Sequence, residues 1–197
     1  MNTIIYMVRH GAYQNPDGIV PGRMPGFHLS EDGKATIKKV GKFFKDRPID
    51  HVYTSPLERT FETANLISED LPGIKITHVY DLIEVDAKPW QALKLEELYT
   101  NSSYEAFISD PRSDKVPENL HQMASRMKNF VLSLCQKHAG GEVICVSHDY
   151  PILALLLSLE GKPLEMMKSY NASMGSITTL VFNEKCDLLE ASYTELQ

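Results

Sequence analysis

Two arginines and two histidines lie at or shortly after the ends of predicted strands, where loops or helices begin. Arg9 and His10 follow an apolar run near the start of the chain, His148 follows another such run, and Arg59 lies early in a predicted helix. Guanidinium groups stay charged and form bidentate hydrogen bonds with phosphoryl oxygens. A neutral histidine can act as a nucleophile. Phosphoryl transfer also needs a proton for the leaving oxygen, which the carboxyl of Glu84 can supply after a third apolar stretch.

Apolar runs rich in β-branched residues alternate along the chain with amphipathic helical patterns. Strands are predicted over 4–8, 51–54, 74–80, 143–146, 177–182 and 188–193, and helices over about 31–45, 56–67, 120–134 and 151–159. Ser30 is the expected N-cap of the first helix, and Ser55 to Glu58 is interpreted as a capping box of the second. The alternation predicts an α/β fold, a three-layer α/β/α sandwich with a mostly parallel central sheet. Ligands bind such sheets beyond the carboxyl ends of the strands, where the arginines and histidines would converge.

One segment, from Glu84 to about Pro117, departs from this alternation. It is polar, contains Trp90 and lacks a clean helical or strand period. We therefore expect a small cap insertion outside the core sheet, within a single domain that spans residues 1–197.

Composition excludes several classes of protein. The chain carries 20 Lys and Arg against 26 Asp and Glu, and this net charge of −6 argues against a nucleic-acid binder that uses a basic surface. The longest apolar stretch near the C-terminal third, 152–157, is far too short to cross a bilayer, and no secretion signal is visible. Cys135, Cys145 and Cys186 are odd in number and lack metal-ligand spacing, so we expect neither disulfides nor zinc, and a cytoplasmic location.

Other phosphate chemistries lack their motifs. The positions six residues after each cysteine are Gly141, Pro151 and Ser192, so the Cys-x5-Arg loop of cysteine phosphatases is missing. The sequence also has no G-x-x-x-x-G-K-[ST] loop, no D-x-D pair and no H-E-x-x-H helix. A scheme built on the arginines and histidines requires no metal and no cofactor, and we expect neither.

The ordered motifs of the chain resemble those of a known family. They are Val8-Arg9-His10-Gly11, Tyr53 to Thr60 with Glu62-Thr63-Ala64, Leu29-Ser30 with Gly33, Leu93 with Glu96-Glu97-Leu98, and Val146-Ser147-His148. In this order the motifs resemble the histidine phosphatase (phosphoglycerate mutase-like) superfamily, and the similarity covers nearly the whole chain. The resemblance implies that His10 is transiently phosphorylated, that Arg9, Arg59 and His148 hold the phosphate, and that Glu84 donates the proton.

The sequence departs from the family pattern in two loops. Tyr13 replaces a small hydroxylated residue, and Asn15 sits one place before the usual Asn, in the loop whose candidate substrate-binding residues are Asn15, Gly22 and Arg23. Near the acid, relatives often carry Gly-x-Trp-Glu-Gly, whereas residues 88–92 of this chain read Lys-Pro-Trp-Gln-Ala. Asp86 is therefore the alternative acid.

These observations predict a metal-independent phosphomonoester hydrolase that acts through a phosphohistidine on a small phosphorylated metabolite, with no nucleic-acid or membrane partner. The resemblance leaves phosphoglycerate mutase-type phosphotransfer as the alternative, although the short cap favours hydrolysis. A non-catalytic phospho-ligand binding protein and a phosphohistidine protein phosphatase are further alternatives. Arg23, Lys88 and Lys94 are cations that could meet an anionic part of a substrate.

Overall fold

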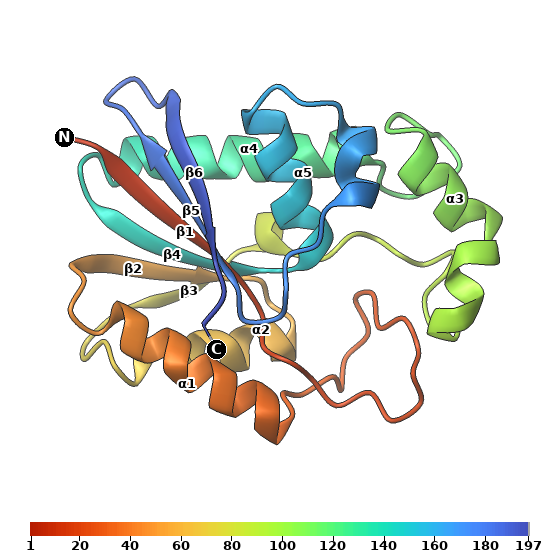
Figure 1. Ribbon diagram of the computed structural model, residues 1–197, viewed down its shortest axis with the longest axis horizontal. Helices are drawn as coiled ribbons and strands as arrows, with labels where there is room; N and C mark the ends of the chain where they lie inside the picture. The colour runs from red at the N-terminus through yellow and green to blue at the C-terminus, as the bar shows by residue number, and fades with distance from the viewer. Residues whose placement is uncertain (197) are drawn as a thin grey trace.

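Six strands form one mixed sheet in the computed structural model, which describes residues 1–196 (Figure 1). Their spatial order is β3-β2-β4-β1-β5-β6, with bounds Thr3–Arg9 (β1), Ile49–Thr54 (β2), Ile76–His78 (β3), Glu142–Ser147 (β4), Ile177–Phe182 (β5) and Leu188–Thr194 (β6). The first four strands pair in parallel, whereas β5 is antiparallel to both of its neighbours. The predicted mostly parallel sheet is confirmed, and the carboxyl ends of β1, β2 and β4 lie at one edge.

Helices cover both faces of the sheet (Figure 1). The helices α1 (Glu31–Phe44) and α2 (Glu58–Ser68) pack on one face, and α4 (Leu120–Lys137) and α5 (Asp149–Leu159) pack on the other. Side chains of β1 alternate between the two layers: Ile5 and Met7 join the cluster of α4 and α5, and Tyr6 and Val8 join that of α1 and α2. The three-layer α/β/α prediction is confirmed. Among the described residues, no helix has the length and apolar character to span a membrane.

The segment between β3 and α4 has a hydrophobic cluster of its own. Trp90 is 1% exposed and its ring lies 5.3 Å from that of Phe107, which belongs to the short helix α3 (Ser102–Ser109). The cluster continues onto α4 and α5 through Met123 and Leu153, so the cap is packed firmly onto one helical layer. A 3₁₀ helix, η2 (Leu95–Thr100), precedes α3 and places Leu98 beside Trp90 in the same cluster. The sequence pattern did not predict these two short helices.

Two predicted boundaries differ from the structure. β3 covers only Ile76–His78 of the predicted 74–80, because only three of its residues pair with β2 and Tyr80 already begins a 3₁₀ turn. The predicted capping box at Ser55 is wrong: α2 begins at Glu58, and its N-cap Leu57 makes no side-chain cap bond. The Ser55 hydroxyl bonds His148 (2.9 Å), and its contact with the helix start is a long one from the Leu57 N–H (3.5 Å).

Candidate active site

His10 immediately follows β1 at the sheet edge and is 3% exposed. Its backbone N–H donates to the Ser147 carbonyl (3.1 Å), and its Nδ1 lies 2.9 Å from the Gly11 carbonyl oxygen. Because a carbonyl can only accept, Nδ1 must carry the proton and Nε2 is left with a free lone pair. Burial, and secondarily the Arg59 charge, hold the pKa of His10 well below its ordinary value. The ring is thus neutral and oriented as a nucleophile.

The backbone after His10 packs directly against the start of α1. Ser30 caps this helix by accepting from the Gly33 N–H (3.1 Å). A Cβ on Gly33 would lie 1.9 Å from the Ala12 carbonyl oxygen, so only glycine permits this approach. The Gly11 N–H also donates to Thr63 of α2 (3.0 Å), and together these contacts fix the segment that carries His10.

Arg59 enters the site from the first turn of α2 and is 1% exposed. One guanidinium nitrogen donates to the Gly22 carbonyl (2.9 Å), which orients the group, while its Nε and NH1 have no partner within residues 1–196. Arg9 approaches from the opposite side, where its NH1 lies 3.4 Å from Asp149 and donates to the Ala172 carbonyl. Its Nε is likewise buried without a partner among the described residues.

His148 is fully buried at the end of β4, and its Nε2 lies 2.9 Å from the Ser55 hydroxyl. Burial, and next the charge of Arg59, keep the pKa of His148 well below its ordinary value, so the ring is neutral. When the Ser55 hydroxyl donates to Nε2, the ring proton resides on Nδ1. Nδ1 has no hydrogen-bond partner within the described chain and lies 3.8 Å from Glu84 Oε2.

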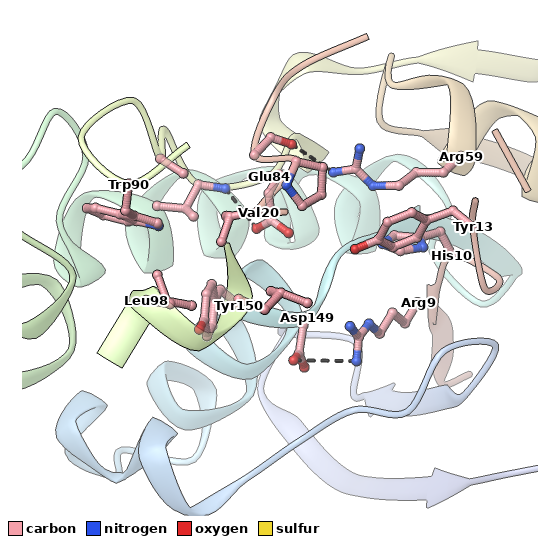
Figure 2. Close-up of a pocket in the computed structure, with 15 residues that line it drawn as sticks. Arg9, His10, Tyr13, Val20, Arg59, Glu84, Trp90, Leu98, Asp149 and Tyr150 are labelled. Carbon is pink, nitrogen blue, oxygen red and sulfur yellow. Dashed lines mark hydrogen bonds and ion pairs between the residues drawn. The ribbon is translucent and has the colours of Figure 1, made fainter. Parts of the chain in front are cut away.

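Buried donors without partners gather around His10. They are the Nε of Arg9, the Nε and NH1 of Arg59, and the Nδ1 of His148, and the described residues hold no other buried side-chain nitrogen or oxygen without a partner. The ring centroids of His10 and His148 are 5.2 Å apart, and both guanidinium groups face the same cavity as His10 (Figure 2). Buried donors are nearly always satisfied in folded proteins. This cluster is therefore organised for a ligand rich in acceptor oxygens and negative charge.

Glu84 lies across the cavity from His10, after the 3₁₀ turn that follows β3 (Figure 2). Its side chain is 15% exposed, and its Oε1 accepts from the Val85 N–H (2.9 Å). Burial raises the pKa of Glu84, although Arg59 opposes this effect. Since Oε1 is occupied as an acceptor, the proton of the neutral form belongs on Oε2, the oxygen nearer His148.

The structure brings together Arg9, His10, Gly22, Arg59 and Glu84 around one cavity, with His148 directly behind them. Asn15 and Arg23, the other two candidate substrate-binding residues, are outside the residues that line the cavity. The Asn15 amide bonds both backbone groups of Ile19 (2.8 and 3.1 Å) and thereby closes its own loop.

Arg23 is engaged on the outer side of the Glu84 loop. Its Nε donates to the Glu84 carbonyl (2.7 Å) and its NH2 donates to Glu118 (2.8 Å). Asp86 lies 3.9 Å from Arg23 and 3.5 Å from Lys88. The alternative acid thus lies outside the cavity lining, and the geometry favours Glu84.

Sequence reasoning missed Asp149 and Tyr150, which line the cavity at the start of α5. It also predicted that Ser55 caps a helix, whereas its hydroxyl bonds His148. An acidic residue directly after His148, at the end of a buried strand, was a signal for Asp149. The pairing of Ser55 with His148 had no local signal, because it joins β2 to β4 across the sheet. Within residues 1–196, no three His, Cys, Asp or Glu side chains are grouped as metal ligands.

Comparison with known proteins assigns the family. Residues 5–193 match the family model of the histidine phosphatase superfamily, branch 1. The chain belongs to this superfamily. It is 33% identical over 185 residues to an uncharacterized protein of Mycobacterium tuberculosis, covering 92% of this chain and 91% of that protein. It is also 26% identical to phosphoserine phosphatase 1 of Hydrogenobacter thermophilus, covering 94% of this chain and 89% of that enzyme.

Solved structures share the fold. The phosphoserine phosphatase of Entamoeba histolytica superposes with a TM-score of 0.83 at 24% identity, covering 98% of each chain. A mycobacterial glucosyl-3-phosphoglycerate phosphatase gives a TM-score of 0.80 at 20% identity, covering 99% of this chain and 98% of that one. The predicted enzyme class, a phosphatase of the histidine phosphatase type, is confirmed.

Proposed function

We propose that this phosphatase is a metal-independent phosphomonoester hydrolase that forms a phosphohistidine on His10 Nε2. The observation that carries the proposal is the set of buried, unpartnered donors of Arg9, Arg59 and His148 around a neutral His10. Two guanidinium forks and an imidazole N–H match the charge and geometry of a phosphoryl group. None of these groups requires a metal to hold phosphate.

In the first step, the Nε2 lone pair of His10 attacks phosphorus in line with the ester oxygen. An N–P bond forms while the P–O bond to the leaving group breaks, and the leaving oxygen takes the bonding electron pair together with a proton from Glu84 Oε2. Arg9, Arg59 and His148 donate to the equatorial oxygens, whose charge they offset throughout. Glu84 ends this step as a carboxylate, which the nearby Arg59 charge stabilises.

In the second step, the Glu84 carboxylate takes a proton from water as the water oxygen attacks phosphorus. The N–P bond breaks, its electron pair returns to His10 Nε2, and inorganic phosphate leaves. The cycle therefore restores both a neutral His10 and a protonated Glu84. Release of the dephosphorylated alcohol before water attacks separates hydrolysis from phosphotransfer.

The named relatives support a small phosphorylated metabolite as the substrate. One curated relative is a phosphoserine phosphatase, and the Entamoeba histolytica enzyme of the same fold was solved in complex with 3-phosphoglyceric acid. Other relatives are named phosphoglycerate mutase-like, among them a protein of Arabidopsis thaliana with 27% identity. Phosphotransfer between positions of phosphoglycerate is therefore the second candidate.

The test is hydrolysis of p-nitrophenyl phosphate in EDTA by the wild type, His10→Ala and His121→Ala. His121 is an exposed histidine in α4 and controls for the loss of an imidazole. We expect His10→Ala alone to abolish turnover, and acid-quenched wild type to carry one phosphoryl mass on the His10 peptide. Full activity in His10→Ala, or activity that returns after EDTA only with a divalent metal, would contradict the proposal. Interconversion of 2- and 3-phosphoglycerate faster than phosphate release would favour the mutase.

A further inference from the structure

The cavity that contains His10 has two chemically different ends. Arg9, His10 and Arg59 occupy one end, and Trp90 and Leu98 form the other (Figure 2). A phosphoryl group held at the cationic end directs its leaving group toward the cap. The side chains at the cap end therefore decide which leaving groups fit.

The cap end of the cavity is apolar. Its lining comes from the cap, the loop after β1 and the start of α5, and comprises Val20, Pro21, Val85, Ala87, Trp90, Leu95, Leu98 and Tyr150. The Tyr150 hydroxyl is already bonded to the Tyr104 hydroxyl (2.7 Å), so it offers mainly its ring. The whole cavity has a volume of about 160 Å³, and the phosphoryl group takes part of it. Closed engineered cavities of about 150 Å³ accept benzene, so the enclosed part of this cavity suits a compact group.

No cation faces this end among the described residues that line the cavity, apart from Arg9 and Arg59 at the phosphate end. The three cations that could have met an anionic substrate are used elsewhere. Arg23 holds the Glu84 carbonyl and Glu118, Lys94 donates to the Asp17 carbonyl (2.5 Å), and Lys88 is 77% exposed beside Asp86. A carboxylate on the leaving group would thus lose its hydration without gaining a cationic partner.

The carboxylate of Asp149 adds to this discrimination. Glu84 and Asp149 both line the cavity between its two ends (Figure 2). Asp149 is 3.4 Å from Arg9 and accepts from the Ala172 N–H (3.0 Å), so it is held in place beside Tyr150. A leaving group with its own carboxylate would be repelled by Asp149 as well as desolvated.

We infer that the preferred substrates are phosphomonoesters of compact, uncharged, apolar alcohols, and that phosphoserine and phosphoglycerate are poor substrates. This inference rests on the proposed function, because it assumes that the phosphoryl group sits against His10. It also separates this chain from the relatives that are named for phosphoserine and phosphoglycerate.

The test compares esters of primary alcohols, so that the oxygen that leaves is chemically similar. Benzyl and propyl phosphate represent apolar leaving groups, phosphoethanolamine a cationic one, and phosphoserine and 3-phosphoglycerate those with a carboxylate. We expect kcat/KM for benzyl phosphate to exceed that for phosphoserine and that for 3-phosphoglycerate by at least about tenfold, and that for phosphoethanolamine by less, because Asp149 attracts an ammonium group. Equal or faster hydrolysis of phosphoserine or 3-phosphoglycerate would overturn the inference, and so would phosphoethanolamine as the best substrate.

A charge introduced at the cap end tests the cause. Leu98→Lys places a cation on the apolar wall, and Leu189→Lys, at an exposed position of β6, adds the same charge away from the cavity. We expect the ratio of kcat/KM for 3-phosphoglycerate to that for benzyl phosphate to rise about tenfold or more in Leu98→Lys only. An unchanged ratio in a folded Leu98→Lys contradicts the inference, and the substrate comparison in the wild type decides it if that variant does not fold.

The two proposals fail in different ways. If no ester is hydrolysed and no phosphoryl mass appears on His10, the proposed function fails and this inference fails with it. If His10 is phosphorylated by every ester, with phosphoserine as the fastest donor, the proposed function stands and only the substrate preference is wrong.

Discussion

Ser55→Ala tests whether the chain uses this serine to set the proton position on His148. The Ser55 hydroxyl lies 2.9 Å from His148 Nε2, both residues are fully buried, and Nδ1 of the same ring has no hydrogen-bond partner within residues 1–196. With the hydroxyl removed, the neutral ring can place its proton on Nε2 instead. Nδ1 would then be an acceptor facing the oxygens of an anion.

The size of the effect follows from the bond that is lost. A hydrogen bond to a charged group contributes about 1.5–3 kcal/mol, and about 1.4 kcal/mol is a factor of ten in rate. We therefore expect kcat/KM for p-nitrophenyl phosphate to fall about 10- to 150-fold in Ser55→Ala. The inhibition constant of inorganic phosphate should rise as well, because the proposed function has the same donor hold the product.

Thr60→Val is the matched control. The Thr60 hydroxyl is buried in the same turn and donates to the carbonyls of Ser55 (2.9 Å) and Leu57 (2.7 Å), but it does not contact His148. Ser55→Ala should unfold at lower urea concentration because it leaves the buried Nε2 of His148 unpaired, and Thr60→Val should do so because it removes the hydroxyl bonds to the Ser55 and Leu57 carbonyls. Only Ser55→Ala should show the large loss of kcat/KM. If Ser55→Ala is destabilised but keeps the kcat/KM of the wild type, Ser55 does not set the position of the proton on His148.

Three further predictions concern proton transfer, the Glu84 loop and the packing beneath His10. Burial lowers the pKa of His10 and raises that of Glu84, so kcat/KM should fall in acid as His10 gains a proton and in alkali as Glu84 loses one. Glu84→Gln should remove the fall of kcat/KM in alkali. A wild-type kcat/KM that keeps rising with pH contradicts this assignment of the two groups. Arg23→Ala removes the hydrogen bond that holds the Glu84 carbonyl, so the Glu84 side chain is less well positioned and kcat should fall about tenfold with little change in KM in steady-state assays. A change in KM alone would indicate that Arg23 contacts the substrate. Gly33→Ala should destabilise the protein by about 1–3 kcal/mol in urea unfolding, because the new Cβ would lie 1.9 Å from the Ala12 carbonyl oxygen. Replacing glycine by alanine inside a helix usually stabilises a protein by about 0.5–1 kcal/mol, and a gain of that size here would show that the helix and the Ala12 backbone are not in close contact.

The sequence by itself determined the layers of the fold and most of the charged residues that meet at the cavity. Alternating runs such as Ile4–Val8 place successive side chains on opposite faces of the sheet, which is a local consequence of strand geometry. Arg9 ends one strand, and His10 and His148 each follow a strand. The carboxyl ends of these strands meet at one edge in a parallel sheet, so the convergence of the three residues could be predicted from order along the chain. Their chemical roles, the cytoplasmic location and the single-domain organisation stay predictions.

Only the tertiary structure decided the details that depend on contacts between distant segments. Ser55 has the sequence of a helix cap, yet its hydroxyl bonds His148, which lies 93 positions further along the chain, directly after the neighbouring strand β4. From the sequence, Arg23 is a cation that could contact the substrate. In the structure its guanidinium group lies outside the cavity, where it donates hydrogen bonds to Glu118 and the Glu84 carbonyl. The cap pattern was too irregular to reveal that Trp90 and Leu98 form an apolar wall, because that wall depends on how the cap packs onto α4 and α5. Local periodicity fixes which face a side chain takes, whereas hydrogen-bond partners across the sheet are fixed only when the layers assemble.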